Sequence, residues 1–178
     1  MVEIINGTLI NAELLFEQIA PTGGQANFDF QNIPGDFSLL QIFINGKTEK
    51  AATDVDGVYI SFNGDTTDGN YYRVYHIAGG VAGASHDVYV ASDRYFMELG
   101  SDKTATNVGG GVAWIAGYTS GFYKMVRSIS GSYYNSNEYV IETSIFWQST
   151  AKINRITFTT QSTLDFSAGT RCSIYGFG

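Results

Sequence analysis

Apolar and polar residues alternate in short segments from Ser38 onward, and each segment ends at glycine, asparagine, aspartate or serine. Leu40, Ile42 and Ile44, for example, occupy every second position before Asn45-Gly46. A period of two places such side chains on one face of an extended strand, and Asn-Gly favours a tight turn. The pattern therefore predicts successive antiparallel strands joined by short connections.

The same pattern recurs along the chain and predicts about ten strands. We expect one before Pro34 and others within 40–44, 58–62, 71–76, 88–90, 95–99, 112–118, 122–130, 139–147, 153–160 and 172–175. Residues 12–20 fit either a helical stripe behind Asn11 or a strand, and the surrounding β pattern favours the strand. The glycine clusters 79–80 and 109–111 are expected at loop tips.

So many short strands cannot form one flat open sheet, so two packed sheets or a closed barrel are expected. We predict an all-β, antiparallel β-sandwich of the jelly-roll type. A chain of 178 residues fits one domain, with 1–8 as a short N-terminal arm and 9–178 as the sandwich.

Charge and cysteine content narrow the possible partners. The chain carries 17 acidic and 10 basic residues without a run of Lys or Arg, which argues against nucleic acid as a partner. It shows no secretory signal pattern and no apolar run of membrane-spanning length, so we expect no membrane partner. The lone Cys172 excludes an intrachain disulfide framework and agrees with folding in a reducing cytoplasm.

The sequence contains only weak motifs for catalysis or metal binding. The run Ser85-His86-Asp87 holds the residue types of a hydrolase triad, but neighbours in an extended strand point to opposite faces. Two histidines and one cysteine without zinc-site spacing do not indicate zinc. The oxygen-rich segment 63–70 could hold calcium loosely, yet it lacks the closing glutamate of an EF-hand, and an ordinary turn is favoured. We therefore predict no catalytic, cofactor-binding or metal-binding residues and no enzyme activity.

Aromatic residues are more numerous than one face of each strand can bury, so some rings should be exposed. Exposed tyrosine and tryptophan are typical of protein interfaces and of platforms that stack on sugars. The alternative is that outward tyrosines simply satisfy strand propensity and cross-strand pairing. The candidate contact residues, for an interface or a glycan, are Tyr71, Tyr72, Trp114, Tyr118, Tyr133 and Tyr134.

The order of several motifs resembles that of a loose family of small bacteriophage virion structural proteins. The motifs are FDFQNIPG at 28–35, FNGD at 62–65, NY at 70–71, YK at 123–124, Trp147 before a late strand, INRITF at 153–158, LDFSAGT at 164–170 and IYG at 174–176. The similarity runs from about residue 9 to the end. The 65–70 turn is longer than the family's usual form, and 81–111 does not align. The resemblance implies an architecture and no catalytic chemistry.

Within such a family, we expect an external capsid decoration protein that stabilises neighbouring capsid subunits. The implied partners are further copies of the chain, in trimers, and the major capsid protein or other virion proteins, and the implied location is the virion. The strand-rich domain starts almost at residue 9 and leaves no long shaft or coiled coil for attachment to a tail. The alternative is a tail-associated receptor-binding protein for host carbohydrate. A glycan-cleaving enzyme is weaker still, because no carboxylate spacing selects a catalytic pair.

Overall fold

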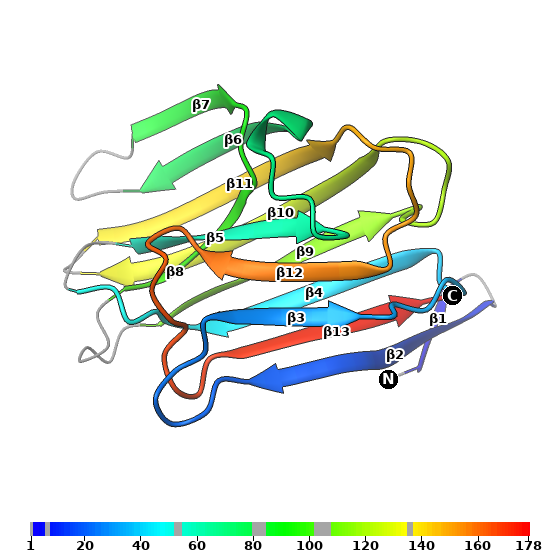
Figure 1. Cartoon of the computed structure of the whole chain (residues 1–178), viewed down its shortest axis with the longest axis horizontal. Coiled ribbons are helices and arrows are strands. Elements are labelled where there is room, and N and C mark those ends of the chain that lie inside the picture. Colours follow the sequence, from blue (N-terminus) through cyan, green and yellow to red (C-terminus); the bar gives the residue numbers. More distant parts are fainter. Residues whose placement is uncertain (1, 6–7, 52–54, 80–84, 102–107, 135–136) are drawn as a thin grey trace.

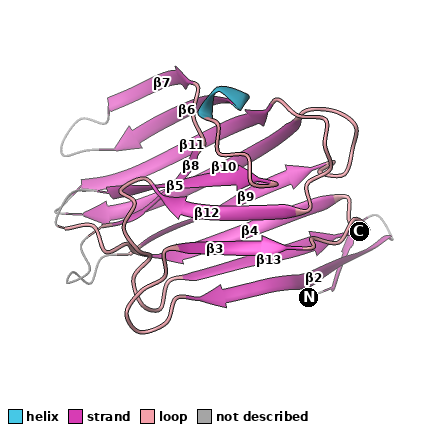
Figure 2. Cartoon of the chain, in the orientation of Figure 1, coloured by secondary structure: helices cyan, strands magenta, loops and turns pink. Residues whose placement is uncertain are grey.

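The computed structural model shows two stacked β-sheets (Figure 1). It describes residues 2–5, 8–51, 55–79, 85–101, 108–134 and 137–178. Within these ranges almost all regular structure is strand, and the short 3₁₀ turn η1 (Asp68–Asn70) stands apart from the strands in Figure 2. The predicted antiparallel β-sandwich is confirmed, with thirteen described strands in place of about ten.

The larger sheet has nine strands in the order β1-β2-β13-β4-β9-β10-β11-β6-β7, and every pairing is antiparallel. In chain order its strands are β1 (Val2–Ile5), β2 (Thr8–Ile19), β4 (Leu39–Gly46), β6 (Tyr71–Gly79), β7 (Ser85–Ala91), β9 (Gly109–Ala116), β10 (Lys124–Tyr134), β11 (Asn137–Trp147) and β13 (Arg171–Phe177). Residues 2–5, expected in a free arm, pair with the start of β2 at the sheet edge.

The smaller sheet has four antiparallel strands in the order β3-β12-β5-β8. These are β3 (Asn27–Gln31), β5 (Val55–Phe62), β8 (Tyr95–Gly100) and β12 (Arg155–Thr160). The chain crosses repeatedly between the layers, so several neighbouring strands, such as β13 and β4 or β3 and β12, are distant in sequence (Figure 1).

The structure decides the conformation of two segments, residues 12–19 and 109–111. Residues 12–19 are part of β2, so the strand interpretation of this segment is confirmed. The expectation that 109–111 form a loop tip is wrong, because these glycines open β9 in the middle of the larger sheet. Gly79 ends β6, and Gly80 lies outside the described residues.

The core lies between the two sheets, where alternate residues of each strand face inward. Each large apolar side chain that is removed from water contributes about 1.5–3 kcal/mol, so the interlayer space dominates the folding energy. Fully buried members include Leu40, Ile42, Ile44, Ala113, Ile115, Ile145, Cys172 and Ile174 from the larger sheet and Phe28, Phe30, Ile60, Phe62, Phe96, Ile156 and Phe158 from the smaller one. The lone Cys172 is fully buried in this core.

Strand β8 approaches the larger sheet so closely that small residues must face it. The Ser128 hydroxyl donates a hydrogen bond to the Phe96 carbonyl, and the Glu98 amide donates to Ser130 Oγ at 3.1 Å. A Cβ atom on Gly109 would lie 2.6 Å from the backbone nitrogen of Gly100. The inward glycine of β9 is therefore required by the packing of β8, since any larger residue would clash with its backbone.

The 63–70 turn is held to both sheets by Asp65. Its carboxylate accepts hydrogen bonds from the Trp147 indole (2.8 Å), the Asn70 amide (3.0 Å) and the Thr67 backbone (3.1 Å). Burial alone would raise the pKa of Asp65, but these three donors outweigh it and lower the pKa. The buried Tyr71 hydroxyl donates to the Asp65 carbonyl (2.9 Å) and accepts from the Phe62 amide (3.0 Å).

A second carboxylate, Asp29, joins β3 to β12. It accepts two hydrogen bonds from the Arg155 guanidinium at 2.8 and 3.0 Å, one from the Thr157 hydroxyl at 2.9 Å and one from the Gln31 amide at 2.7 Å. The bonds from Arg155 are the largest cause that lowers the pKa of Asp29 from 3.8 to about 2.

Replacing Tyr71 with phenylalanine should lower the free energy of unfolding by about 1–3 kcal/mol, because the Phe62 amide loses its buried acceptor. The matched control is Tyr72→Phe, one residue further along the strand, where the side chain faces outward and is exposed. Urea unfolding followed by tryptophan fluorescence measures both. Equal stability of the two variants would contradict the role given to the Tyr71 hydroxyl.

The Asp29 cluster should make stability depend on acid pH. Because the pKa of Asp29 is lower in the folded than in the unfolded state, its contribution is complete above about pH 4 and is lost as the pH falls towards 2. Because the Arg155 and Asp29 side chains keep 43% and 22% of their surface exposed, solvent screening limits this contribution to roughly 1 kcal/mol. Urea midpoints between pH 2 and 7 should therefore fall less steeply with acidification in Asp29→Asn than in the wild type. Parallel curves would refute the assignment.

Candidate functional site

No part of the chain that the structure describes forms a second layer over the outer face of the larger sheet, and many side chains on this face are apolar and exposed. Strand register aligns outward residues of neighbouring strands in rows that run across the sheet. Four such rows cross the six strands from β13 to β6, and together they are called the outer face below. The rows contain Met125–Phe146–Tyr72, Gln41–Trp114–Arg127, Phe43–Val112–Ile129 and Gly110–Gly131.

One row is formed by Met125, Phe146 and Tyr72 on β10, β11 and β6. Met125 pairs with Phe146, and Phe146 pairs with Tyr72. Each of the three side chains keeps between 38% and 45% of its surface exposed. Such a contiguous exposed row differs from the scattered apolar residues of an ordinary surface and indicates an interaction site.

A second row is formed by Phe43, Val112 and Ile129 on β4, β9 and β10. Phe43 and Ile129 are exposed, and the Phe43 ring packs edge-on against Tyr175 of β13 with centroids 5.7 Å apart. This contact fixes the orientation of Phe43, so the row presents a preformed apolar ridge.

The row between these two is more polar and carries Trp114. Trp114 pairs with Gln41 on one side and with Arg127 on the other. Arg127 forms an ion pair with Glu142 of β11 across the outer face. Because the chain has a net charge of −7, this internally neutralised surface differs from the acidic remainder.

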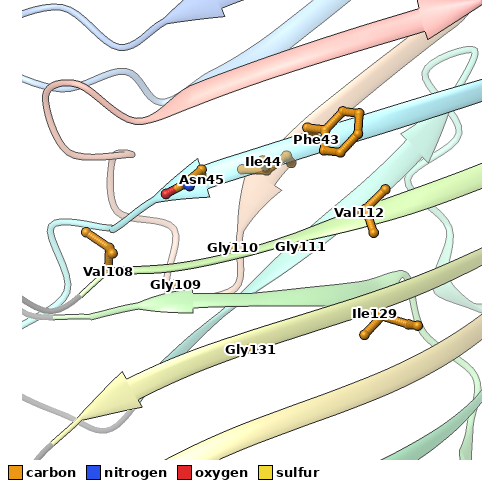
Figure 3. Close-up of a pocket in the computed structure, with 10 residues that line it drawn as sticks. All are labelled: Phe43, Ile44, Asn45, Val108, Gly109, Gly110, Gly111, Val112, Ile129 and Gly131. Carbon is orange, nitrogen blue, oxygen red and sulfur yellow. The ribbon is translucent and has the colours of Figure 1, made fainter.

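A hollow lies beside the Phe43–Ile129 row. Gly110 and Gly131 pair across β9 and β10 and have no side chains to fill the outer face at this point. Figure 3 shows Phe43, Val112 and Ile129 beside the hollow and the glycine backbone as its floor, and the space measures about 530 Å³. The outer face therefore carries both protruding apolar side chains and an apolar depression.

The structure separates the six contact candidates. Tyr71 and Tyr118 are fully buried, which corrects their assignment as surface contacts: the Tyr118 hydroxyl donates to the Pro34 carbonyl inside the fold, and Tyr71 holds the 63–70 turn. Tyr72 and the half-buried Trp114 lie on the outer face, each in a different row. Tyr133 and Tyr134 belong to β10, but their side chains lie outside the described residues.

Four exposed apolar residues of the outer face are absent from the sequence-based candidates. They are Phe43, Met125, Ile129 and Phe146. The available signal was a break in alternation, since Phe43 stands between Ile42 and Ile44, and Phe146 between Ile145 and Trp147. An apolar residue between two inward apolar residues must point outward, so such runs mark a strand with two apolar faces.

The suggested chemical motifs are not assembled into a site in the described part of the chain. No group of three or more histidine, cysteine or acidic residues could hold a metal there. In the 63–70 turn, Asp65 is held by Trp147, and Asp68 forms an ion pair with Arg94 at 2.7 Å. The segment 85–87 lies in β7, with its side chains outside the description. No described helix is long and apolar enough to cross a membrane.

A polar pocket of about 220 Å³ lies on the inner side of the larger sheet, next to β8. The Arg73 guanidinium lies 3.9 Å from the Tyr75 ring centroid and 4.5 Å from that of Tyr95, and its Nε is 2.9 Å from Asp93. Glu98 accepts a hydrogen bond from the Tyr95 hydroxyl, and burial raises the pKa of Glu98. Arg73 on β6 thus contacts the Tyr95 ring on β8, while Glu98 Oε2 is buried without a hydrogen-bond partner among the described residues. The polar lining therefore helps to hold β8 to β6.

Comparison with known proteins adds no assignment. No protein-family model, no curated protein and no solved structure matches the chain.

Replacing Glu98 with glutamine should remove the loss of folding stability that ionisation of this buried carboxyl causes at neutral pH. Because the pKa of Glu98 is higher in the folded than in the unfolded state, folding is favoured at low pH and loses stability as the pH rises above about 4.5. Glutamine keeps an acceptor for Tyr95 and does not ionise. We expect the variant to lack this part of the pH dependence and to be at least as stable as the wild type at pH 7.

Urea unfolding between pH 4 and 8 checks this, with Glu13→Gln at an exposed position of β2 as the control. A Glu98→Gln variant that is less stable at every pH, with an unchanged pH dependence, would show that the ionised carboxylate is needed.

Proposed function

We propose that this protein is a structural subunit of a bacteriophage particle, most specifically an external capsid decoration protein, and that its outer face joins it to neighbouring subunits. The observation that carries the proposal is the contiguous apolar surface formed by the Met125–Phe146–Tyr72 and Phe43–Val112–Ile129 rows. The order of sequence motifs shared with small virion proteins supports the phage context.

The extent of the outer face suits a stable interface. Six strands spaced about 4.8 Å apart and four rows about 6.8 Å apart cover about 800 Å². A specific protein–protein interface buries about 800 Å² on each partner, with aromatic residues and methionine enriched at its centre. A particle built from many symmetry-related copies multiplies the effect of each such contact.

The carboxylates support an assembly role over a hydrolytic one. Glycoside hydrolysis needs two carboxyl groups that face each other across a bound sugar. In this structure Asp65, Asp68 and Asp93 are bonded to Trp147, Arg94 and Arg73, and Glu142 is paired with Arg127. These groups stabilise turns and strand contacts.

The second candidate is a tail-associated protein that binds host carbohydrate, and Trp114 is the observation in its favour. An indole between the polar side chains of Gln41 and Arg127 provides both a stacking surface and hydrogen-bonding groups for a sugar. The two candidates differ in what the outer face contacts, so one set of variants tests both.

The protein should co-sediment with empty expanded capsids built from the major capsid protein of the same phage. The double variant Met125→Thr/Phe146→Thr should reduce the bound fraction at least tenfold, because threonine keeps strand propensity but removes the apolar contact. Leu164→Thr is the matched control, since Leu164 is similarly exposed but lies in the loop between β12 and β13.

A parallel sedimentation with host-surface polysaccharide completes the test. Binding to polysaccharide but not to capsids, abolished by Trp114→Ala, would replace decoration with receptor binding. Equal capsid binding by the wild type and the Met125→Thr/Phe146→Thr variant would remove the outer face from the proposal.

A further inference from the structure

The outer face has the properties of a surface that fits a copy of itself. A two-fold interface brings the same patch of both subunits together, so each patch must offer a protrusion and a matching depression. Here the protrusion is the row of Met125, Phe146 and Tyr72, and the depression is the hollow over Gly110 and Gly131. Both features lie on one sheet face.

Their spacing along β10 is suited to this symmetry. Met125 and Gly131 lie on the same strand, six residues apart, so both point to the outer face and are separated by about 20 Å. A two-fold axis that lies in the plane of the interface, and crosses the strands near position 128, exchanges the two positions. Met125 of one copy then faces Gly131 of the other.

We infer that the partner of the outer face is a second copy of this chain, packed face to face so that Met125 of each copy enters the glycine-floored hollow of the other. This inference rests on the assembly role proposed for the outer face and names its occupant. Two sheets stacked in this way form an aligned sandwich, with inner side chains interdigitating across about 10 Å.

Charge favours a copy of the chain in this position. Two subunits of net charge −7 repel each other in most orientations. The charged pairs on this sheet face are internally neutralised, Arg127 with Glu142 and Arg171 with Glu17. Contact through the outer face therefore brings together charges that are already paired within each copy, and the area of about 800 Å² on each copy is that of a stable interface.

This arrangement predicts a dimer instead of the trimer expected from the sequence. A patch that packs on itself closes after two copies, whereas a three-fold ring needs two different patches on each subunit. Light scattering of the purified protein at micromolar concentrations should give twice the chain mass of 19.4 kDa. A monomeric or trimeric mass would overturn the inference.

Cross-linking tests the register. The double variant Met125→Cys/Gly131→Cys carries two thiols too far apart to pair within one chain, but opposed between two copies. The native Cys172 is fully buried and does not compete. With a short bis-maleimide, which bridges two thiols on sheets about 10 Å apart, we expect a cross-linked dimer from the double variant and from an equimolar mixture of the two single variants. Each single variant alone should stay unlinked, because equivalent positions are about 20 Å apart in the dimer.

A dimer linked equally well by Met125→Cys alone would place the axis elsewhere and refute the register. If Gly131→Cys does not fold, Met125→Lys replaces the double variant, with Leu164→Lys as its control. Met125→Lys should raise the dimer dissociation constant at least tenfold in sedimentation equilibrium, and an unchanged constant would overturn the inference.

The capsid-binding experiment tests the decoration role independently of the dimer. A dimer of the stated register that does not bind capsids leaves this inference intact and rejects the decoration role. Capsid binding by a protein that is monomeric in solution and gives no cross-linked dimer rejects this inference and leaves the decoration role intact.

Discussion

The packing of the four-stranded sheet against the inner face of the larger sheet is the interaction on which the rest of the structure depends. It buries the inward side chains of both layers, including Phe30, Ile42 and Phe158, and so supplies most of the apolar burial. Four strands can cover only one face of the nine-stranded sheet. The apolar side chains that point the other way are therefore left uncovered by the described part of the chain.

The glycine run at 109–111 links this packing to the proposed interface. Gly109 faces inward and gives β8 room to approach the sheet, since a Cβ atom there would meet the Gly100 backbone. Gly110 faces outward and, with Gly131, leaves the hollow that Figure 3 shows. Because these glycines have no side chains, the segment allows β8 to pack closely on one face of the sheet and leaves a hollow on the other.

The polar groups named above stabilise the fold. Asp65 binds the 63–70 turn to Trp147, Asp29 joins two strands through Arg155, and Arg73 ties β6 to β8 through the Tyr95 ring. Because buried polar groups must be paired, each such contact fixes one geometry of the sandwich. A rigid sandwich with an exposed apolar face is suited to assembly, in which the free energy of binding comes from area and shape.

The sequence alone determined the fold class, because a period of two and turn residues at strand ends are local properties of the chain. It also indicated that aromatic residues exceed what one core face can hold. It could not assign individual rings, and Tyr71 and Tyr118 proved to be core residues while Phe43 and Phe146 face outward. Only the tertiary structure decided this, because which strands adjoin, and which face the smaller sheet covers, depend on pairings between residues far apart in sequence.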